Sequence, residues 1–464
     1  MYGIMRKAFI LCCAMLLCLF SMTSCLEFDF EETPPDIFDE LIEENVESND
    51  ERGDKGDKTE AETSRPEENQ TEDNTNNDVG EIPPGQMYFF LTEDGTYTLG
   101  AVDDILAGAI EIPDNISGVN VTSIGSEAFK DVSGITSVVI PDGVVSIDYA
   151  AFEGCTGLTR VVIPDSVTRV DSSAFRGCTN LGEIVFSDSV EYIGVSAIKD
   201  TKYYNDKNNW TDGVLYVGNH LIEAEKTIAG TYTIKPGTKT LAASAFYGCK
   251  LLEKVSVPGS VKTVSDAAFS GCENLWQVTL ESGVKEIGKN TFTNCINLES
   301  IALPNGVVSI GGGAFSKCER LARISLPDSL RRVDKDAFVG TMYYNAADNW
   351  DTGDSLCFLY IGKHLVAGQQ TLAETYAVKE GTLTLAAGVF SFSEALKSIT
   401  LPESLLGIGD FVITGCSSLT DINYGGTQAQ WELIEKTNDG SIYDWDGGLE
   451  AYVIHCVDGD IVKG

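Results

Sequence analysis

The sequence contains few of the residues on which most catalytic and metal sites depend, and it is poor in positive charge. Its 464 residues include 3 histidines, and 32 lysines and arginines stand against 70 aspartates and glutamates, a net charge of −38. Such a chain repels phosphate backbones, which argues against nucleic-acid binding. It has no nucleophile elbow, His-Glu metal motif or glycine-rich phosphate loop, so the sequence predicts a protein that is not an enzyme and uses no cofactor.

Long apolar runs are also scarce, and the one near the start is short. Arg6 and Lys7 precede 13 apolar residues (8–20), too few to span a bilayer as a stable helix. This pattern predicts an export signal over residues 1–24. The string Met-Thr-Ser-Cys that ends at Cys25 resembles the lipobox of bacterial lipoproteins, which implies lipid attachment at Cys25 and an anchor on the outer face of a bacterial membrane or cell surface. The alternative is cleavage near this point without a lipid.

The segment that follows is acidic and has few apolar residues. Residues 26–85 hold 22 acidic and 4 basic side chains, so they carry −18 of the total charge and leave −20 on the rest. A segment of this composition cannot bury enough apolar surface to offset its chain entropy. We therefore expect residues 25–85 to form a disordered tether. A role in binding cations or a basic partner is the alternative.

A 23-residue repeat organises the remainder of the chain. Leu158, Val161 and Ile163 alternate as a short strand, which Pro164 ends because it has no N–H. A unit of this length cannot cover its own apolar face, so neighbouring units must stack as a solenoid. The Phe that marks the phase, or an Ile in its place, recurs at eleven positions: Phe129, Phe152, Phe175, Ile198, Phe246, Phe269, Phe292, Phe315, Phe338, Phe390 and Ile413.

The order L-x-x-V-x-I-P-x-x-V-x-x-I-x-x-x-A-F-x-x-C resembles the leucine-rich repeat of the BspA-like surface proteins of bacteria, over roughly residues 120–426. The resemblance implies a right-handed leucine-rich-repeat solenoid, β-rich with short turns and helical segments. We expect about eleven 23-residue coils plus two irregular hairpin coils, within residues 123–426. The family also implies display on the cell surface, and adhesion to host proteins or to other cells.

The two ends of the repeat region differ from it in composition. Phe89 to Leu99 reads as a β-hairpin with Asp94-Gly95 in its turn, and we assign residues 86–122 to an N-terminal β cap. Trp431 and Ile434 have helical spacing, and the residues from Ala451 to Cys456 alternate as a strand. Residues 427–464 are therefore expected to form a C-terminal cap.

Two irregular coils, near 199–228 and 339–372, are copies of each other. Each contains a predicted hairpin, which we expect to leave the solenoid wall, where loops commonly carry binding function. Their aromatic rings could form a ligand platform, or they could cover the coils where the array is interrupted. The candidate ligand-binding residues are Tyr203, Tyr204, Trp210, Tyr343, Tyr344 and Trp350. A calcium loop near Asn205 is a weaker alternative, because the copy lacks the equivalent ligands.

Seven cysteines occupy one phase of the repeat: Cys155, Cys178, Cys249, Cys272, Cys295, Cys318 and Cys416. Neighbouring coils lie about 4.8 Å apart with parallel side chains, which holds the sulfur atoms beyond bonding distance. We expect a column of buried thiols that act as small apolar filler. A ladder of metal ions is the alternative, but a repeated column does not converge on a point.

Three functions remain open. The first is adhesion, in which a monomer binds an extracellular or host protein, or a neighbouring cell surface. The second is glycan binding through the tryptophans of the irregular coils. The third is a structural envelope protein without a soluble ligand. The adhesion hypothesis ranks first because of the family resemblance.

Overall fold

The computed structural model describes residues 87–102, 105–351, 357–369, 373–436 and 444–464. All described residues belong to one compact unit. The predicted export signal, the lipid site Cys25 and the predicted tether lie outside the described residues. Within the described ranges, no helix combines the length and the hydrophobicity that crossing a bilayer requires.

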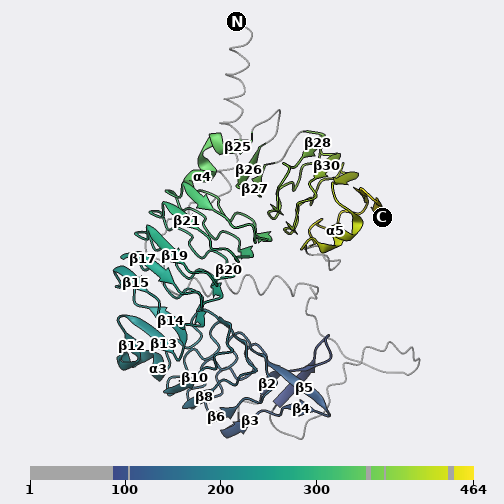
Figure 1. The fold of residues 1–464 in the computed structure, drawn as a ribbon. Helices are drawn as coiled ribbons and strands as arrows, with labels where there is room; N and C mark the ends of the chain where they lie inside the picture. Colours follow the sequence, from purple (N-terminus) through teal and green to yellow (C-terminus); the bar gives the residue numbers. More distant parts are fainter. Residues whose placement is uncertain (1–86, 103–104, 352–356, 370–372, 437–443) are drawn as a thin grey trace, which may run out of the picture. The chain divides into compact units, whose positions relative to one another are not determined.

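Each regular coil contributes one strand to a first row of parallel strands (Figure 1). Pairing joins residues one coil apart, as in Ile184 opposite Val161, so the row keeps the 23-residue register. The strands are β3 (Gly108–Glu111), β6 (Ile135–Val139), β8 (Arg160–Val162), β10 (Glu183–Val185), β15 (Gly230–Thr233), β17 (Leu252–Val257), β19 (Gln277–Leu280), β21 (Ser300–Ala302), β23 (Arg323–Ser325), β28 (Thr375–Ala377), β30 (Ser398–Leu401) and β32 (Asp421–Tyr424).

In most coils a second, usually shorter strand follows the turn after the first, and these strands form a second row. In most of these strands the second residue is buried, as Ile147 and Val170 are, because it faces the core. The strands are β5 (Val119–Ile124), β7 (Ser146–Ile147), β9 (Arg169–Val170), β11 (Tyr192–Ile193), β16 (Thr240–Leu241), β18 (Thr263–Val264), β20 (Glu286–Ile287), β22 (Ser309–Ile310), β24 (Arg332–Val333), β29 (Thr384–Leu385) and β31 (Gly407–Ile408).

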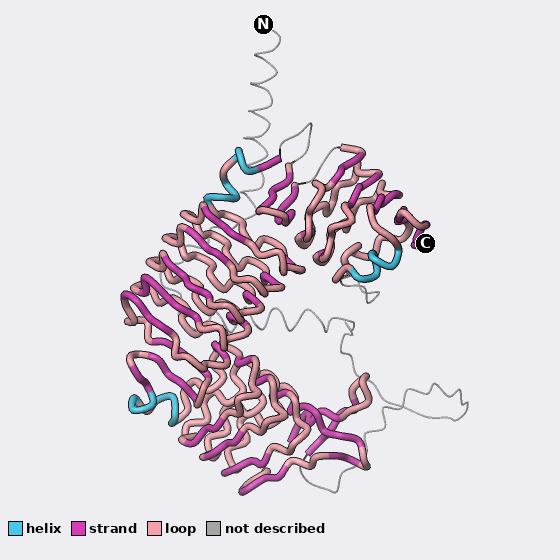
Figure 2. Tube along the Cα trace, viewed as in Figure 1, coloured by secondary structure: helices cyan, strands magenta, loops and turns pink. Residues whose placement is uncertain are grey.

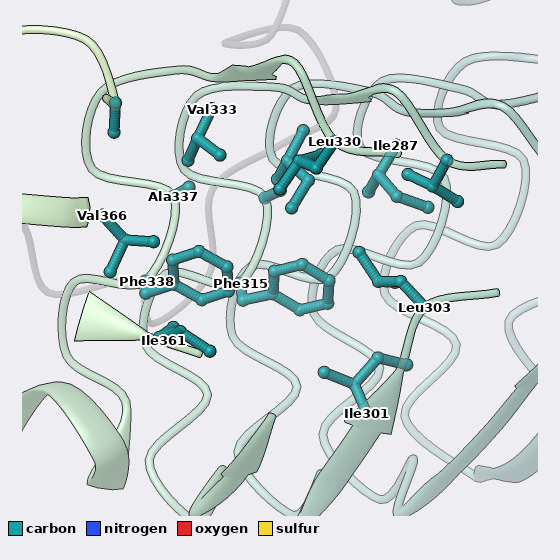
Figure 3. Close-up of a cluster of buried hydrophobic side chains, with 14 of the residues drawn as sticks. Ile287, Ile301, Leu303, Phe315, Leu330, Val333, Ala337, Phe338, Ile361 and Val366 are labelled. Carbon is teal, nitrogen blue, oxygen red and sulfur yellow. The ribbon is translucent and has the colours of Figure 1, made fainter. Parts of the chain in front are cut away.

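The phenylalanines that mark the repeat form stacks in the core. Ring centroids of successive coils lie 4.7 to 5.4 Å apart, with near-parallel planes, from Phe129 to Phe175 and from Phe246 to Phe338. Figure 3 shows Phe315 and Phe338 side by side among aliphatic residues of neighbouring coils. The backbone keeps the coils in step, because the N–H of Phe152 donates to the carbonyl of Ala174 in the next coil. The predicted stacking of the coils as a solenoid is confirmed.

The cysteine column is buried, and its thiols are free. In six of the seven residues the Sγ donates to the carbonyl of the phenylalanine one coil earlier. Cys155 reaches the oxygen of Phe129 at 2.9 Å, and Cys295 reaches that of Phe269 at 3.2 Å. Burial raises the pKa of Cys416 to about 11, so its thiol keeps the proton that it donates. The cysteine thus fills space and also satisfies a buried carbonyl.

Two turn positions in each coil have a left-handed backbone: the residues two before and two after the phase marker. Small or short polar residues occupy most of them, as expected where a Cβ is strained. Two bulky exceptions lie in the last coils: Phe392 (φ 59°) and Phe411 (φ 57°). The Phe392 side chain is 56% exposed, and its ring lies over the backbone of Gly415.

The predicted elements at both ends are present. At the start, β1 (Met87–Leu91) and β2 (Tyr97–Val102) form the antiparallel hairpin, and β4 (Asn115–Ile116) pairs with β5. At the other end, Thr427 caps α5 (Gln428–Leu433), and its hydroxyl and Gln430 form a capping box. Finally, β33 (Tyr452–Cys456) extends the first row beside β32 and pairs with β34 (Gly459–Lys463).

The hairpins of the irregular coils are part of the wall, which corrects the expectation that they leave it. They are β13 (Val214–Val217) with β14 (His220–Ala224), and β26 (Phe358–Ile361) with β27 (His364–Gly368). The second strand of each hairpin pairs in parallel with the next strand of the second row, β14 with β16 and β27 with β29. All four residues of β13 are buried. Because both of its faces are covered, this strand is apolar throughout, whereas an exposed hairpin alternates.

The strand β13 also separates two hydrophobic clusters. Leu215 and Val217 pack with the coils before the hairpin. Val214 and Tyr216 pack with the coils after it. Since successive side chains of a strand point to opposite faces, one strand closes both cores. The irregular coil therefore joins two stacks rather than interrupting the solenoid.

Candidate functional site

The two irregular coils contain all the predicted ligand-binding residues, and they share one scaffold. We call residues 199–228 module 1 and residues 339–372 module 2. Module 1 contains α3 (Lys202–Asn205), η2 (Lys207–Asn209) and β12 (Trp210–Thr211); module 2 contains α4 (Met342–Asn345), η3 (Ala347–Asn349) and β25 (Trp350–Asp351). Figure 2 shows the short helices of both modules beside strand-rich coils. In each copy a threonine begins the helix, because its hydroxyl accepts the tyrosine N–H three residues later at 3.0 Å.

The tryptophan of each module packs against a tyrosine of its own helix. The indole of Trp210 donates to the carbonyl of Tyr204 at 2.8 Å, and the indole of Trp350 donates to that of Tyr344 at 2.6 Å. The two rings meet edge to face, with centroids 5.4 and 5.0 Å apart. Each pair is half-buried. The indole N–H groups are therefore occupied within the modules.

The other tyrosine of each module ties the helix to the hairpin. The hydroxyl of Tyr203 donates to the carbonyl of Tyr216 at 2.9 Å, and Tyr343 donates to Tyr360 at the same distance. Burial raises the pKa of Tyr203 and of Tyr343, so both hydroxyls remain protonated donors. The structure thus brings the three predicted aromatic residues together within each module. These contacts are those of packing, and the ligand-binding role stays a prediction.

Charged side chains surround the aromatic pair of module 1. The ammonium of Lys207 lies 4.2 Å from the ring centroid of Trp210 and 2.8 Å from a carboxylate oxygen of Glu225. The hydroxyl of Tyr204 donates to Glu223 at 3.0 Å. Module 2 has neutral residues at the positions of the lysine and the two glutamates, which are Ala347, Ala367 and Gln369.

The solvent face of the first row of strands carries an uncharged column that the sequence analysis did not single out. From β6 to β32, the solvent-facing residue nearest the end of each strand is uncharged and pairs in register with its counterparts within each sheet, whereas β3 has Glu111 at this position. We call this set the uncharged row: Val139, Val162, Val185, Thr233, Ser256, Thr279, Ala302, Ser325, Ala377, Thr400 and Asn423.

Valines form the start of the uncharged row. Val139, Val162 and Val185 are 57%, 40% and 44% exposed. Two residues earlier on the same face, Arg160 and Glu183 form an ion pair at 2.7 Å, so the neighbouring column is charged. The signal was present in the sequence, because from Val139 onward the residue before each Ile-Pro or its equivalent lacks charge, although Glu111 holds this position in the first coil. The alternation of apolar and polar residues along a strand shows which side chains face solvent, but it does not show which of them a partner covers.

The three histidines do not form a catalytic group. His220 and His364 are buried at equivalent positions of the two hairpins, and burial lowers their pKa. His455 lies in the C-terminal region, with its ring nitrogens 2.9 Å from Asp421 and from Asp460. The hydrogen bond to Asp421, followed by that to Asp460, raises the pKa of His455. In the described part of the chain, no group of three His, Cys, Asp or Glu side chains is arranged to hold a metal ion.

Comparison with solved structures finds leucine-rich repeat proteins of low sequence identity. A leucine-rich repeat protein from Bacteroides ovatus is 23% identical, with 75% of this chain and 85% of that chain covered and a TM-score of 0.28. A leucine-rich cell surface protein from Faecalibacterium prausnitzii is 22% identical, with 78% and 98% covered and a TM-score of 0.24. A leucine-rich repeat protein from T. pallidum is 23% identical, with 52% and 90% covered and a TM-score of 0.27. The search of curated proteins found no match.

The family comparison is decisive, because it covers more than half of the chain. The model of the BspA type leucine-rich repeat region matches in six copies, over residues 108–228, 231–346 and 361–432. These ranges include the stacked phenylalanines, the cysteine column and most of both modules. The protein belongs to the BspA-type leucine-rich-repeat family.

Proposed function

We propose that this protein is exported, anchored by a lipid at Cys25, and binds a protein partner on a host or neighbouring cell surface without catalysing a reaction. The observation that carries the proposal is the exposed valine column, in register on β6, β8 and β10. Apolar residues that are contiguous on the surface of a protein often belong to interaction sites, whereas singly scattered ones do not.

The chemistry of the uncharged row suits a protein partner. β-Branched and small side chains on paired strands are stiff, so little side-chain entropy is lost when a partner covers them. The centre of a protein interface is depleted in charged residues, whereas its rim is polar. Here the ion pair of Arg160 and Glu183 lies beside the valines. The row therefore has the character of an interface core flanked by a polar rim.

Binding to extracellular-matrix proteins and to whole partner cells tests the proposal. The intact protein is expected to bind at least one of them saturably, and Val162→Lys is expected to weaken that binding at least tenfold. An exposed substitution of this kind changes stability by about 0.5 kcal/mol or less. The matched control is Val145→Lys, which charges a valine 46% exposed that precedes β7 in the second row. Equal loss in both variants, or no saturable binding by the parent, would count against the proposal.

The anchor has its own test. Cys25→Ala is expected to release the protein from the membrane fraction, because a lipid chain contributes about 0.8 kcal/mol for each buried methylene group. Mass spectrometry of the amino-terminal peptide identifies the lipid directly. Retention of the Cys25→Ala protein on membranes would show that another segment holds it there.

A further inference from the structure

The two modules keep the same internal scaffold but differ in surface charge. The threonine caps and the tyrosine and tryptophan hydrogen bonds are present in both. Two neutral residues of module 1, Asn208 and Thr211, correspond to Asp348 and Asp351 of module 2, but more positions change from charged to neutral. These include Lys202 and Met342, Asp206 and Ala346, Lys207 and Ala347, Glu223 and Ala367, and Glu225 and Gln369. Since the scaffold is the same, the need to fold does not account for this loss of charge.

The first consequence concerns the tryptophan. In module 1 the face of Trp210 lies under the ammonium of Lys207, which Glu225 also holds. The corresponding residue of module 2 is Ala347, which is exposed. Among the residues that the structure describes, no cation lies over the ring of Trp350. One aromatic face is thus closed by an ion pair in module 1 and is free of it in module 2.

The second consequence concerns a hydroxyl group. In module 1 the hydroxyl of Tyr204 is engaged by Glu223 at 3.0 Å. Module 2 has Ala367 at that place, and within the described ranges the hydroxyl of Tyr344 has no hydrogen-bond partner. Burial raises the pKa of Tyr344, so this hydroxyl is neutral and can both donate and accept. A free hydroxyl therefore adjoins an aromatic ring without a covering charge.

We propose that module 2 binds a neutral carbohydrate, and that module 1 does not. A sugar ring presents C–H groups that stack on the face of Trp350 and hydroxyls that hydrogen-bond to Tyr344. The charged residues next to Ala347 and Trp350 are acidic, Asp348 and Asp351, so an anionic ligand is repelled whereas a neutral one is not. The site is also small: α4 and η3 together extend about 12 Å. A protein partner usually needs about 800 Å² on each side, whereas a short oligosaccharide does not.

Affinity electrophoresis of the intact protein tests this proposal, in gels that contain mannan, xylan, laminarin or the anionic hyaluronan. At least one neutral polysaccharide is expected to retard the protein, and hyaluronan is not. The double variant Ala347→Lys with Ala367→Glu introduces the module 1 residues into module 2 and is expected to weaken binding at least tenfold. The reciprocal variant, Lys207→Ala with Glu223→Ala, is the matched control and is expected to bind at least as well as the parent.

Several results would overturn the proposal. They are the absence of retardation by every neutral polysaccharide, undiminished binding by the Ala347→Lys, Ala367→Glu variant, and weaker binding by the reciprocal variant. Circular dichroism checks that each variant is folded, which the exposed position of Ala347 favours. The outcome is separate from protein binding, because Val162→Lys leaves module 2 intact. Loss of polysaccharide binding in Val162→Lys would instead place the carbohydrate on the uncharged row and reject module 2.

Discussion

The regular coils and the irregular modules bury apolar surface in different ways. A regular coil relies on its neighbours, because its phenylalanine is covered by rings 4.7 to 5.4 Å away in the adjacent coils. Module 1 relies on a hairpin whose strand β13 sends alternate side chains into two cores, whereas the hairpin of module 2 packs into one. Identical residues at a fixed spacing are therefore sufficient for a coil, whereas a module needs different residues at each position. This difference predicts where substitutions are most costly.

The largest effect is expected from a ring in the middle of a stack. Phe269 is fully buried between Phe246 and Phe292, so Phe269→Ala removes contacts with both neighbouring coils. We expect a loss of about 3–5 kcal/mol in the free energy of unfolding, measured by urea denaturation. The control is Phe90→Ala, which truncates a ring that is 53% exposed and belongs to no stack. Similar losses in both variants would mean that the stack is not what stabilises the coils.

Each module contains a buried histidine, His220 or His364, which adds a response to acid that the regular coils lack. Burial lowers the pKa of His364 to about 4, although Asp328 opposes the shift, and Lys363 and Arg331 add to it. In the unfolded chain the pKa of a histidine is near 6.5. Between about pH 4 and pH 6.5 the imidazole is therefore protonated in the unfolded chain but neutral in the folded one. The stability from neutral His364 is complete above about pH 6.5 and is lost as the pH falls toward 4, by up to about 3 kcal/mol.

Urea denaturation at pH 7 and pH 5 measures this effect, with His364→Gln as the comparison. The parent protein is expected to lose about 2 kcal/mol more than the variant over this interval. Taking the difference cancels the carboxylates that titrate in both proteins. The effect of His455 on stability has the opposite sign. Its pKa is raised in the folded chain, so it stabilises the fold at low pH, and this contribution is lost as the pH rises through the folded-state pKa. Equal pH dependence of parent and variant would show that the pKa of His364 is the same in the folded and the unfolded chain.

A smaller effect is expected from the cysteine column. Cys295→Ala removes one buried sulfur atom and its hydrogen bond to the carbonyl of Phe269. The expected cost is about 1–1.5 kcal/mol, in the range of other one-atom truncations in a core. Cys357 is half-buried at the edge of module 2 and is the matched control, with a smaller expected cost for Cys357→Ala. An unchanged free energy of unfolding in Cys295→Ala would show that the thiol does not contribute to stability.

The regular coils could be predicted from the sequence because their packing follows from chain spacing. A phenylalanine every 23 residues, as in Phe152 and Phe175, must lie in one column once the coils stack. The same logic placed the cysteines in a buried column. The carbonyl that each thiol satisfies could not be predicted, since it depends on the offset between adjacent turns.

The modules could be predicted only in part. The apolar run Val214 to Val217 indicates a strand covered on both faces, yet a hairpin outside the wall was expected. The contrast between Lys207 and Ala347 was visible in the sequence, but it had no meaning until the ammonium was placed over Trp210. The duplication gave the positions of the aromatic residues. The role of the charges around them required coordinates, because charged contacts depend on side-chain direction rather than on spacing.

The smallest predicted effect has the opposite sign and concerns a regular turn. Phe392 has a positive φ at the position where the equivalent residue two coils earlier is Gly340. A left-handed backbone costs a residue with a Cβ roughly 1–2 kcal/mol, whereas glycine adopts it freely. The ring of Phe392 is largely exposed, so little buried area is lost when it is removed. We therefore expect Phe392→Gly to stabilise the protein by about 1 kcal/mol in urea denaturation.

Lys317→Gly is the matched control for Phe392→Gly, because Lys317 has nearly the same φ, 57°, at the same position of another coil. Both variants are relieved of the same backbone strain, so any difference between them measures the contact of the Phe392 ring with Gly415. A stabilised Lys317→Gly beside a destabilised Phe392→Gly would show that this contact outweighs the strain. The exposed aromatic residue would then serve to close the turn, and the last coils would depend on a side chain where the earlier ones depend on glycine.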